Sequence, residues 1–295
     1  MKIIDCFMYF DEDMVLDIRL NTLSKYVSYF LICEASYNHS GGKKKLKFDI
    51  NKYTKFKDKI IYIPLNQQPE NLHVINSNDA QDIKNSKILD NSLFRENFQR
   101  NFLQTKLNDF QDDDLICISD LDEIPNFENF KYKNKITLFE QKMFYYKFNL
   151  IYPNFKWIGS KLCKKKDLIS PQWLRNIKSK KYPIWRIDTI FSKKKYSNIN
   201  FIKDGGWHFT NIKKPEDLDY KMKSFLHHLE YEESGLDAKK LKRIIDEKKV
   251  MYDHSVDQRK NKWNAQIKLS KVDESVLPDY IKNNKDKFID WLDIT

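Results

Sequence analysis

One stretch of the chain, residues 114–125, constrains the fold more than any other. Leu115–Ile118 is a short, continuous apolar run, which is typical of a strand buried on both faces. Carboxylates follow at once, and Pro125 ends the element because it cannot donate to a ladder. Asp120 and Asp122 are two residues apart, which places their side chains on one side of an extended backbone. Two oxygen ligands at the carboxyl end of a core strand favour a divalent cation bound together with substrate phosphates.

The acidic residues of this stretch also have a simpler interpretation, because carboxylates are common in loops that follow strands. Here six of them fall within residues 112–123 of a chain whose formal charge is +11. Like charges this close are unfavourable unless water or a cation neutralises them. The crowding therefore favours a metal and phosphate site.

The composition describes a folded protein with a basic surface. The 295 residues are enough for one large or two modest domains, and 14% aromatic with 32% charged residues exclude a disordered chain. The positive surplus lies mostly in lysines, with runs at Lys43–Lys45, Lys164–Lys166 and Lys193–Lys195. We expect solvated faces that can also touch an anionic membrane peripherally, and we expect no nucleic acid as a partner.

The sequence shows no pattern of membrane insertion or export. No apolar run reaches 18 residues, so no transmembrane segment is predicted. Met1–Phe7 carries an acid where a signal peptide would be apolar, and we expect the chain to begin directly with a strand. The four cysteines, Cys6, Cys33, Cys117 and Cys163, have no paired or metal-binding spacing. We predict reduced, buried thiols in a cytoplasmic protein.

Apolar patterning predicts an α/β domain in the first 125 residues. Strands are expected at 3–10, 27–33, 60–65 and 115–118, and helices at 14–26 and 91–108. Strands that alternate with helices in this way form a largely parallel sheet. From Ile136 onward, aromatic-rich segments resemble antiparallel strands that flank a pocket. Helices are expected in the last third, at 215–233, 237–249 and 280–292.

Polar residues outside the carboxylate stretch are candidates for the same site. Glu34 follows the second predicted strand, and the carboxyl ends of parallel strands meet at one edge of the sheet. Arg95 and Arg100 lie on the helix that leads into the carboxylate strand. They form either a phosphate clamp or a surface ion-pair array with Glu96 and Gln99, and position alone does not decide between these.

A Gly-Gly-Trp-His segment at residues 205–208 adds a second candidate group. The two glycines let backbone approach a ligand or bend sharply. Trp207 could stack on a ligand, and His208 is either a ligand for a borderline divalent ion such as manganese or a packed core residue. The residues alone leave both interpretations of His208 open.

Six short motifs occur in order between residues 3 and 232. They are Asp5–Phe10 with Glu12 and Ile18–Leu20; Phe30–Ala35 with Gly41 and Lys43–Lys45; Arg95–Arg100; Ser119–Pro125; Gly206–Phe209; and Lys221 with Ser224–His227. Together they resemble glycosyltransferase family 17, the family of the enzyme that adds the bisecting N-acetylglucosamine to N-glycans.

The resemblance implies a GT-A-type fold and a metal-dependent, inverting transferase with UDP-N-acetylglucosamine as the expected donor. Asp120 and Asp122 would hold Mn²⁺ or Mg²⁺ against the diphosphate, with His208 as a third ligand. The implied donor-binding residues are Glu34, Lys43, Arg95, Glu96, Arg100, Asp120 and Trp207. Within this set, Glu34 would contact the base or ribose, and the arginines would offset phosphate charge.

The resemblance also implies how the chain is divided. Residues 1–232 would form a GT-A-like catalytic domain, with a nucleotide-binding half at 1–125 and an acceptor half at 126–232. Residues 233–295 would form a helical extension packed on that domain.

Inversion requires a general base for the acceptor hydroxyl, on the far side of the sugar from the leaving group. Asp204, Asp188 and Glu123 are candidates, and the sequence does not choose among them. Acceptor identity is not carried over from animal relatives, because this chain is rich in lysine, has only six glycines and shows no membrane anchor. We expect a bacterial or viral surface polysaccharide or oligosaccharide rather than an N-glycan.

Two other functions fit parts of the pattern. A sugar-phosphate nucleotidyltransferase would also use paired acids, but it normally carries a Gly-rich loop after the first strand, where this chain has Asp11-Glu12-Asp13. A non-catalytic glycan- or nucleic-acid-binding protein would use the basic surface and the aromatics, and would leave Asp120 and Asp122 unexplained. Glycosyl transfer is therefore the leading hypothesis.

Overall fold

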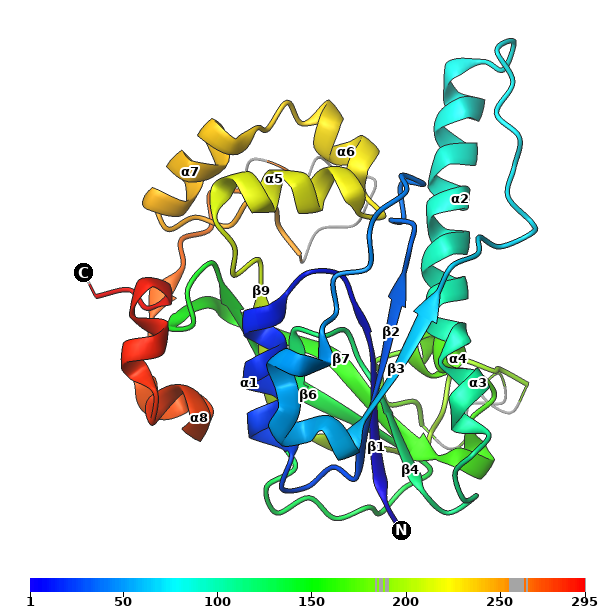
Figure 1. Ribbon diagram of the computed structural model, residues 1–295, viewed down its shortest axis with the longest axis vertical. Helices are drawn as coiled ribbons and strands as arrows, with labels where there is room; N and C mark the ends of the chain where they lie inside the picture. Colours follow the sequence, from blue (N-terminus) through cyan, green and yellow to red (C-terminus); the bar gives the residue numbers. More distant parts are fainter. Residues whose placement is uncertain (184, 186–187, 189–190, 255–262, 264, 295) are drawn as a thin grey trace.

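The computed structural model describes residues 1–183, 185, 188, 191–254, 263 and 265–294. Within these residues, ten strands form one mixed sheet, and helices cover both faces of its parallel half (Figure 1). The α/β architecture expected from the sequence is confirmed. None of the helices in the described part is long and apolar enough to cross a membrane.

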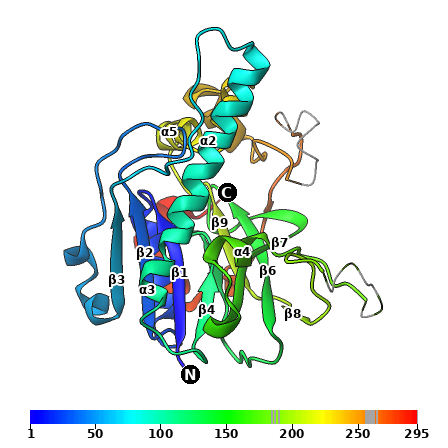
Figure 2. The same ribbon diagram turned by 90° about the vertical axis from the view of Figure 1, so that its right-hand side faces the viewer.

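The first half of the chain forms the parallel part of the sheet. Its strands lie in the order β3 (Ile60–Leu65), β2 (Tyr29–Ala35), β1 (Ile3–Tyr9) and β4 (Leu115–Ile118), and all neighbouring pairs are parallel (Figure 2). β1 and β2 are almost entirely buried because alternate side chains enter two separate cores. The four predicted strands are confirmed to within two residues at each end.

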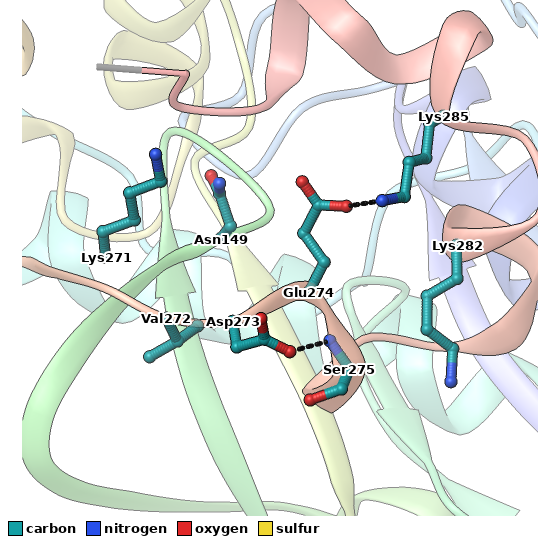
Figure 3. Close-up of a pocket in the computed structure, with 8 residues that line it drawn as sticks. All are labelled: Asn149, Lys271, Val272, Asp273, Glu274, Ser275, Lys282 and Lys285. Carbon is teal, nitrogen blue, oxygen red and sulfur yellow. Dashed lines mark hydrogen bonds and ion pairs between the residues drawn. The ribbon is translucent and has the colours of Figure 1, made fainter.

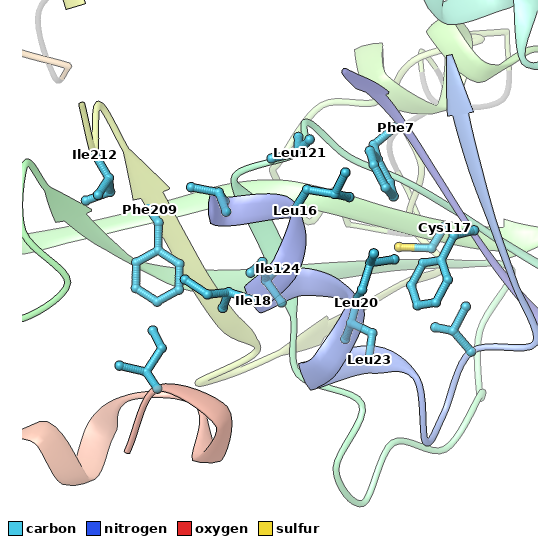
Figure 4. Close-up of a cluster of buried hydrophobic side chains, with 14 of the residues drawn as sticks. Phe7, Leu16, Ile18, Leu20, Leu23, Cys117, Leu121, Ile124, Phe209 and Ile212 are labelled. Atoms are coloured by element: carbon cyan, nitrogen blue, oxygen red, sulfur yellow. The ribbon is translucent and has the colours of Figure 1, made fainter. Parts of the chain in front are cut away.

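Helices cover the two faces of this half separately. α1 (Asp13–Leu23) lies on one face, and Figure 4 shows its side chains between those of β1 and β4 on one side and Phe209 on the other. The end of α2 (Gln81–Phe102), α3 (Gln104–Leu107) and α4 (Pro171–Asn176) cover the other face, where Leu103 and Leu174 pack with Ile116. α2 begins ten residues before the predicted helix, and its polar first turns stand away from the body of the protein (Figure 1).

The second half of the chain continues the sheet with pairs of both kinds. β7 (Leu150–Lys164) runs antiparallel to β4 and to β6 (Ile136–Tyr145), as the aromatic-rich pattern predicts. β8 (Ile199–Ile202) and β9 (Gly206–Thr210) each run parallel to β6. β5 (Glu123–Pro125) follows β4 after four residues, yet pairs with β9 at the far end of the strand order. The sheet therefore curls until β5 meets β7, where the Ser160 hydroxyl donates to the Glu123 carbonyl at 3.0 Å.

The last part of the chain is helical only in part. α5 (Pro215–Ser224), α6 (His228–Glu233) and α7 (Ala238–Asp246) bury their apolar side chains against those of β6 and β7. β10 (Ser270–Lys271) adds a strand beside β7, within residues 233–295, which the sequence predicts to be a helical extension. α8 (Asp279–Lys282) and the 3-10 segments η4 (Glu274–Val276) and η5 (Lys285–Trp291) pack against the α1 side of the core. Two more 3-10 segments are η1 (Ile50–Lys59) and η2 (Lys165–Asp167).

One buried side chain holds the loop between β4 and β5. The guanidinium of Arg19, on α1, is fully buried and forms a bidentate pair with Asp5 of β1 at 2.6 and 2.7 Å. Its other N–H groups donate to the carbonyls of residues 120, 121 and 123 at 2.9–3.0 Å, and to the Ser119 hydroxyl at 2.5 Å. A guanidinium presents five donors in a rigid fork, so this single residue can fix the path of the whole loop.

We predict that Arg19→Met destabilises the protein by about 3–5 kcal/mol, because Asp5 is left buried without a counter-charge. Urea unfolding followed by circular dichroism measures this change. The matched control is Arg243→Met, which removes an exposed pair with Glu247 and should leave the unfolding free energy nearly unchanged. If the Arg19→Met protein were as stable as the wild type, the loop would not depend on this pair.

Candidate active site

A cavity of about 320 Å³ lies at the carboxyl ends of β1 and β4. β2 lies on one side of β1 and β4 on the other, and ligands of α/β sheets bind at such a switch in strand order. The walls come from the residues after β1, the loop after β2, the β4–β5 loop, the last two turns of α2, β9 and the junction of α5 and α6. We call this space the site cavity.

Two arginines hold Asp120 in the site cavity. Arg100 of α2 reaches Oδ1 at 3.0 Å, and Arg175 of α4 reaches Oδ2 at 2.7 Å. Arg100 also pairs with Glu96, one helical turn earlier, at 2.8 Å. Burial opposes ionisation, but the charges of Arg175 and Arg100 outweigh it and hold the pKa of the Asp120 carboxyl well below its usual range. Asp120 is therefore ionised, and each of its oxygens already has a partner.

Glu123 is fully buried and even more completely paired. Its Oε1 accepts hydrogen bonds from the Trp157 indole at 2.5 Å and from Arg175 at 2.9 Å. Its Oε2 accepts from Arg175 at 2.6 Å and from the Asp120 backbone N–H at 2.8 Å. Gly159 makes room for this carboxylate, since a Cβ at that position would lie 2.1 Å from the Glu123 Cδ. Glu123 thus positions its neighbours. Both of its oxygens are occupied, so neither is free to accept the proton of an acceptor hydroxyl.

Asp122 has a different environment. From the residues that the structure describes, its carboxylate accepts no hydrogen bond; Oδ1 lies 3.6 Å from His208 Nε2 and Oδ2 lies 3.9 Å from Lys221 Nζ. Lys221 also pairs with Glu12 at 3.2 Å. Burial by itself would raise the pKa of Glu12, but the charges of Lys221 and Lys213 lower it to about 2. Asp122 is therefore the cavity carboxylate most available to a ligand.

The predicted metal site is only partly assembled. Asp122 and His208 face each other at a separation that one ion could bridge, since its bonds to oxygen and nitrogen are about 2.0–2.2 Å long. The Nδ1 atom of His208 is buried, and no described residue is its partner. Asp120, by contrast, is turned to Arg100 and Arg175. Across the described ranges, no three His, Cys, Asp or Glu side chains form a group that could hold a metal. The protein would thus supply two ligands rather than three.

Aromatic side chains form another part of the wall. The Trp157 ring lies 5.0 Å from that of His208 and 5.9 Å from that of His254, between centroids. Tyr252 lies 4.2 Å from His254 and 5.0 Å from Trp263. Such rings bury the apolar faces of a ligand, while their polar tips remain able to hydrogen-bond.

Glu34 and Lys43, both predicted to bind the donor, do not line the site cavity. Glu34 is fully buried and accepts hydrogen bonds from Lys44 Nζ at 2.6 Å and the Tyr62 hydroxyl at 3.0 Å. It also accepts from the backbone N–H groups of residues 47 and 48 at 2.8 and 3.0 Å. Glu34 therefore orders the loop that follows β2, and it is Lys44 rather than Lys43 that this loop places in the cavity wall.

Trp207, Asp204 and Asp188 also lie outside the cavity lining. The Trp207 indole donates to a backbone carbonyl of η4 at 2.6 Å, because neighbouring strand residues face opposite sides and His208 takes the cavity side. Asp204 is 80% exposed and pairs with a lysine at 2.9 Å, and Asp188 pairs with another lysine at the same distance. Of the three predicted general bases, Glu123 alone borders the cavity.

The two arginines of α2 have separate environments. Arg100 and its partner Glu96 line the cavity. Arg95 lies beside it, where its guanidinium donates to Gln68 at 2.7 Å and to the His39 carbonyl at 3.3 Å. Arg95 therefore supports the loop after β2 instead of facing the carboxylates.

Sequence reasoning missed the residue that joins the carboxylates, Arg175. The only local signal is the Ser170–Pro171 helix start, which predicts the short helix but says nothing of its contact with the β4–β5 loop. Glu12 and Lys221 belong to motifs of the resemblance, yet no motif shows that they pair across the cavity. Trp157 stands in an aromatic-rich strand that marks a pocket without identifying which ring enters it.

A second hollow, of about 380 Å³, lies beside β10 and α8 (Figure 3). Two of its carboxylates already have partners: Glu274 pairs with Lys285 at 2.5 Å, and Asp273 accepts from the Ser275 backbone N–H at 2.8 Å. The described residues that line it include no histidine and no arginine, whereas those of the site cavity include both. The site cavity is therefore the candidate active site.

Comparison with known proteins identifies the class of enzyme. A sequence model of the family described as Glycosyltransferase family 17 matches residues 1–292 of the 295. The chain belongs to glycosyltransferase family 17. It is therefore a glycosyltransferase, whose substrates are a nucleotide sugar and an acceptor, and the nucleotidyltransferase and binding-protein alternatives are set aside. No curated protein matches the chain.

A buried lysine, Lys161, supports the helix end that carries the site residue Arg175. Lys161 of β7 is 4% exposed, and its Nζ donates to the carbonyls of Arg175 and Ile177, both at 2.6 Å. No described carboxylate pairs with it within 4 Å. The pKa of Lys161 is lowered to about 7, mainly by burial and next by the charge of Arg175. Lys161 thus holds the end of α4, which carries Arg175.

Lys161 predicts a specific pH dependence of stability. The pKa of a lysine in the unfolded chain is about 10.4, which is higher than that of Lys161 in the folded protein. Between these two pH values the unfolded chain binds more protons than the folded one. The unfolding free energy therefore rises with pH in this range. The unfolding free energy of the wild type minus that of Lys161→Met should therefore increase from about pH 6.5 to 8.5. Urea unfolding at several pH values measures this difference. A constant difference would mean that Lys161 titrates as an exposed lysine does, and a falling one would mean that folding raises its pKa.

Proposed function

We propose that this enzyme uses a divalent metal to transfer N-acetylglucosamine from UDP-N-acetylglucosamine to a glycan hydroxyl, with inversion, on a GT-A-type sheet. The family resemblance supports the donor and the stereochemistry. The observation that supports the metal is the Asp122 carboxylate, which accepts no hydrogen bond from the described residues and faces His208 Nε2 at 3.6 Å. The acceptor would be a surface polysaccharide or oligosaccharide, built in the cytoplasm.

The charge of the cavity also supports a divalent cation. Among the described residues, five carboxylates line it: Glu12, Glu96, Asp120, Asp122 and Glu123. Four cationic side chains face them: Lys44, Arg100, Arg175 and Lys221. A nucleotide diphosphate would add further negative charge to a space that has no positive surplus. A divalent ion held by Asp122 and His208 would offset this charge and stabilise the leaving nucleotide.

The protein's own residues would prepare the site before the donor arrives. Arg100 and Arg175 are fixed between carboxylates, so Asp120 and the β4–β5 loop need no rearrangement when charge develops. Lys221 keeps a positive charge beside Asp122 because Glu12 and Asp122 raise its pKa against the effect of burial. The rings of Trp157 and Tyr252 would cover the apolar faces of the sugars and exclude water.

We predict that Asp122→Ala weakens the manganese-dependent binding of UDP at least about tenfold, because one of the two protein ligands is lost. Calorimetric titration of UDP and UDP-N-acetylglucosamine, with Mn²⁺ and with a chelator, measures the effect. Asp112→Ala is the matched control: it removes an exposed carboxylate of the same acidic segment, outside the cavity, and should bind as the wild type does. Unchanged, manganese-dependent affinity in Asp122→Ala would remove Asp122 as a metal ligand.

A further inference from the structure

A chain of hydrogen bonds beside the site cavity fixes the orientation of one histidine. The Gln99 side chain is buried on α2, and its Nε2 donates to the Cys33 carbonyl of β2 at 3.1 Å. This leaves the amide oxygen, Oε1, facing His39 Nε2 at 3.2 Å. An amide oxygen only accepts hydrogen bonds, so the network places the proton of His39 on Nε2.

The other nitrogen of this ring is therefore a free acceptor. His39 lines the site cavity, and none of the described residues donates to its Nδ1. This nitrogen is not one of the polar atoms buried without a partner, so solvent reaches it, and the residue that carries it lines the site cavity. The residue is held in place, since Arg95 donates to its carbonyl at 3.3 Å and the Phe225 ring packs 6.2 Å from its own.

The surroundings of the ring also favour its neutral form. Burial is the main cause that lowers the pKa of His39, and the charge of Arg100 adds to it, while Glu96, the hydrogen bond with Gln99 and Asp120 act in the opposite direction. A neutral imidazole with its proton on Nε2 can accept a hydrogen bond at Nδ1 and cannot donate one there.

We propose that His39 is a specificity-determining residue, which accepts at Nδ1 a hydrogen bond from a neutral O–H or N–H group of the sugar nucleotide. The proposal rests on the proposed function, because it requires a sugar nucleotide in the site cavity. Ionised phosphate offers no donor to a lone pair, so the partner group belongs to the base, the ribose or the sugar. A nucleotide without that group would bury the acceptor unpaired, and the site would select against it.

Two variants and one control test this assignment. His39→Leu removes the acceptor, whereas His39→Asn returns an amide oxygen near the position of Nδ1. The control, His73→Leu, changes a histidine that contacts Asp90 and Phe94 away from the cavity. In calorimetry with Mn²⁺, we expect His39→Leu to bind UDP-N-acetylglucosamine about tenfold more weakly than the wild type does. His39→Asn should recover most of this affinity, and His73→Leu should match the wild type.

Analogues of the donor identify the partner group. If the group is the N–H of uracil, N3-methyl-UDP binds the wild type less tightly than UDP does, but binds His39→Leu as UDP does. If it is a ribose hydroxyl, 2′-deoxy-UDP or 3′-deoxy-UDP gives that pattern instead. If UDP and its analogues bind every protein alike and only UDP-N-acetylglucosamine is weakened in His39→Leu, the group lies on the sugar.

The outcomes separate this proposal from the proposed function. Equal binding of all these nucleotides by the wild type and His39→Leu overturns the assignment of His39 and leaves the transferase intact. A wild type that binds none of them contradicts the proposed function and the assignment with it. The tautomer has its own test in ¹⁵N-histidine spectra of the wild-type protein: we expect His39 to be protonated on Nε2, with an Nδ1 signal that shifts when UDP-N-acetylglucosamine binds. A ring protonated on Nδ1 overturns the proposal even if His39→Leu does not fold.

Discussion

The guanidinium of Arg19 is the interaction on which the site depends. It links β1 through Asp5, α1 through its own backbone, and the β4–β5 loop through three carbonyls and a hydroxyl. A buried charge must keep all of its partners, because each group left unpaired in the interior costs far more than it would in water. The loop therefore has one favoured conformation, and in it Asp120 meets the arginines while Asp122 faces β9.

From this loop, the polar groups of the cavity separate into those that are saturated and those that are open. Arg100 and Arg175 hold Asp120, and Arg175 with Trp157 holds Glu123, which makes this part of the wall rigid. The Asp122 carboxylate lacks hydrogen bonds from the described residues, and the relay through Gln99 satisfies His39 at Nε2 alone. Groups paired on the protein side and open on the cavity side are what a preorganised ligand site requires.

The success and failure of sequence reasoning follow from how local each feature is. Leu115–Ile118 is recognisable as a core strand because a short apolar run bounded by acids has few other interpretations. Glu34 does lie near the carboxyl end of β2, at the expected edge of the sheet, yet the loop that follows and Tyr62 of β3 occupy both of its oxygens. Trp207 and His208 must face opposite sides of β9, but only the packing of η4 against Trp207 decides which of them the cavity receives.

Local pattern was sufficient for the α/β order, for the carboxylates at the end of a core strand and for the family, since each of these is carried by residues close together in the chain. Pairing across the cavity was settled by folding alone. Arg175 meets Asp120 and Glu123 from 55 and 52 residues away, and His39 meets Gln99 from 60 residues away. Such contacts arise from the curl of the sheet and the packing of helices on it, and they leave no signature in any short stretch of sequence.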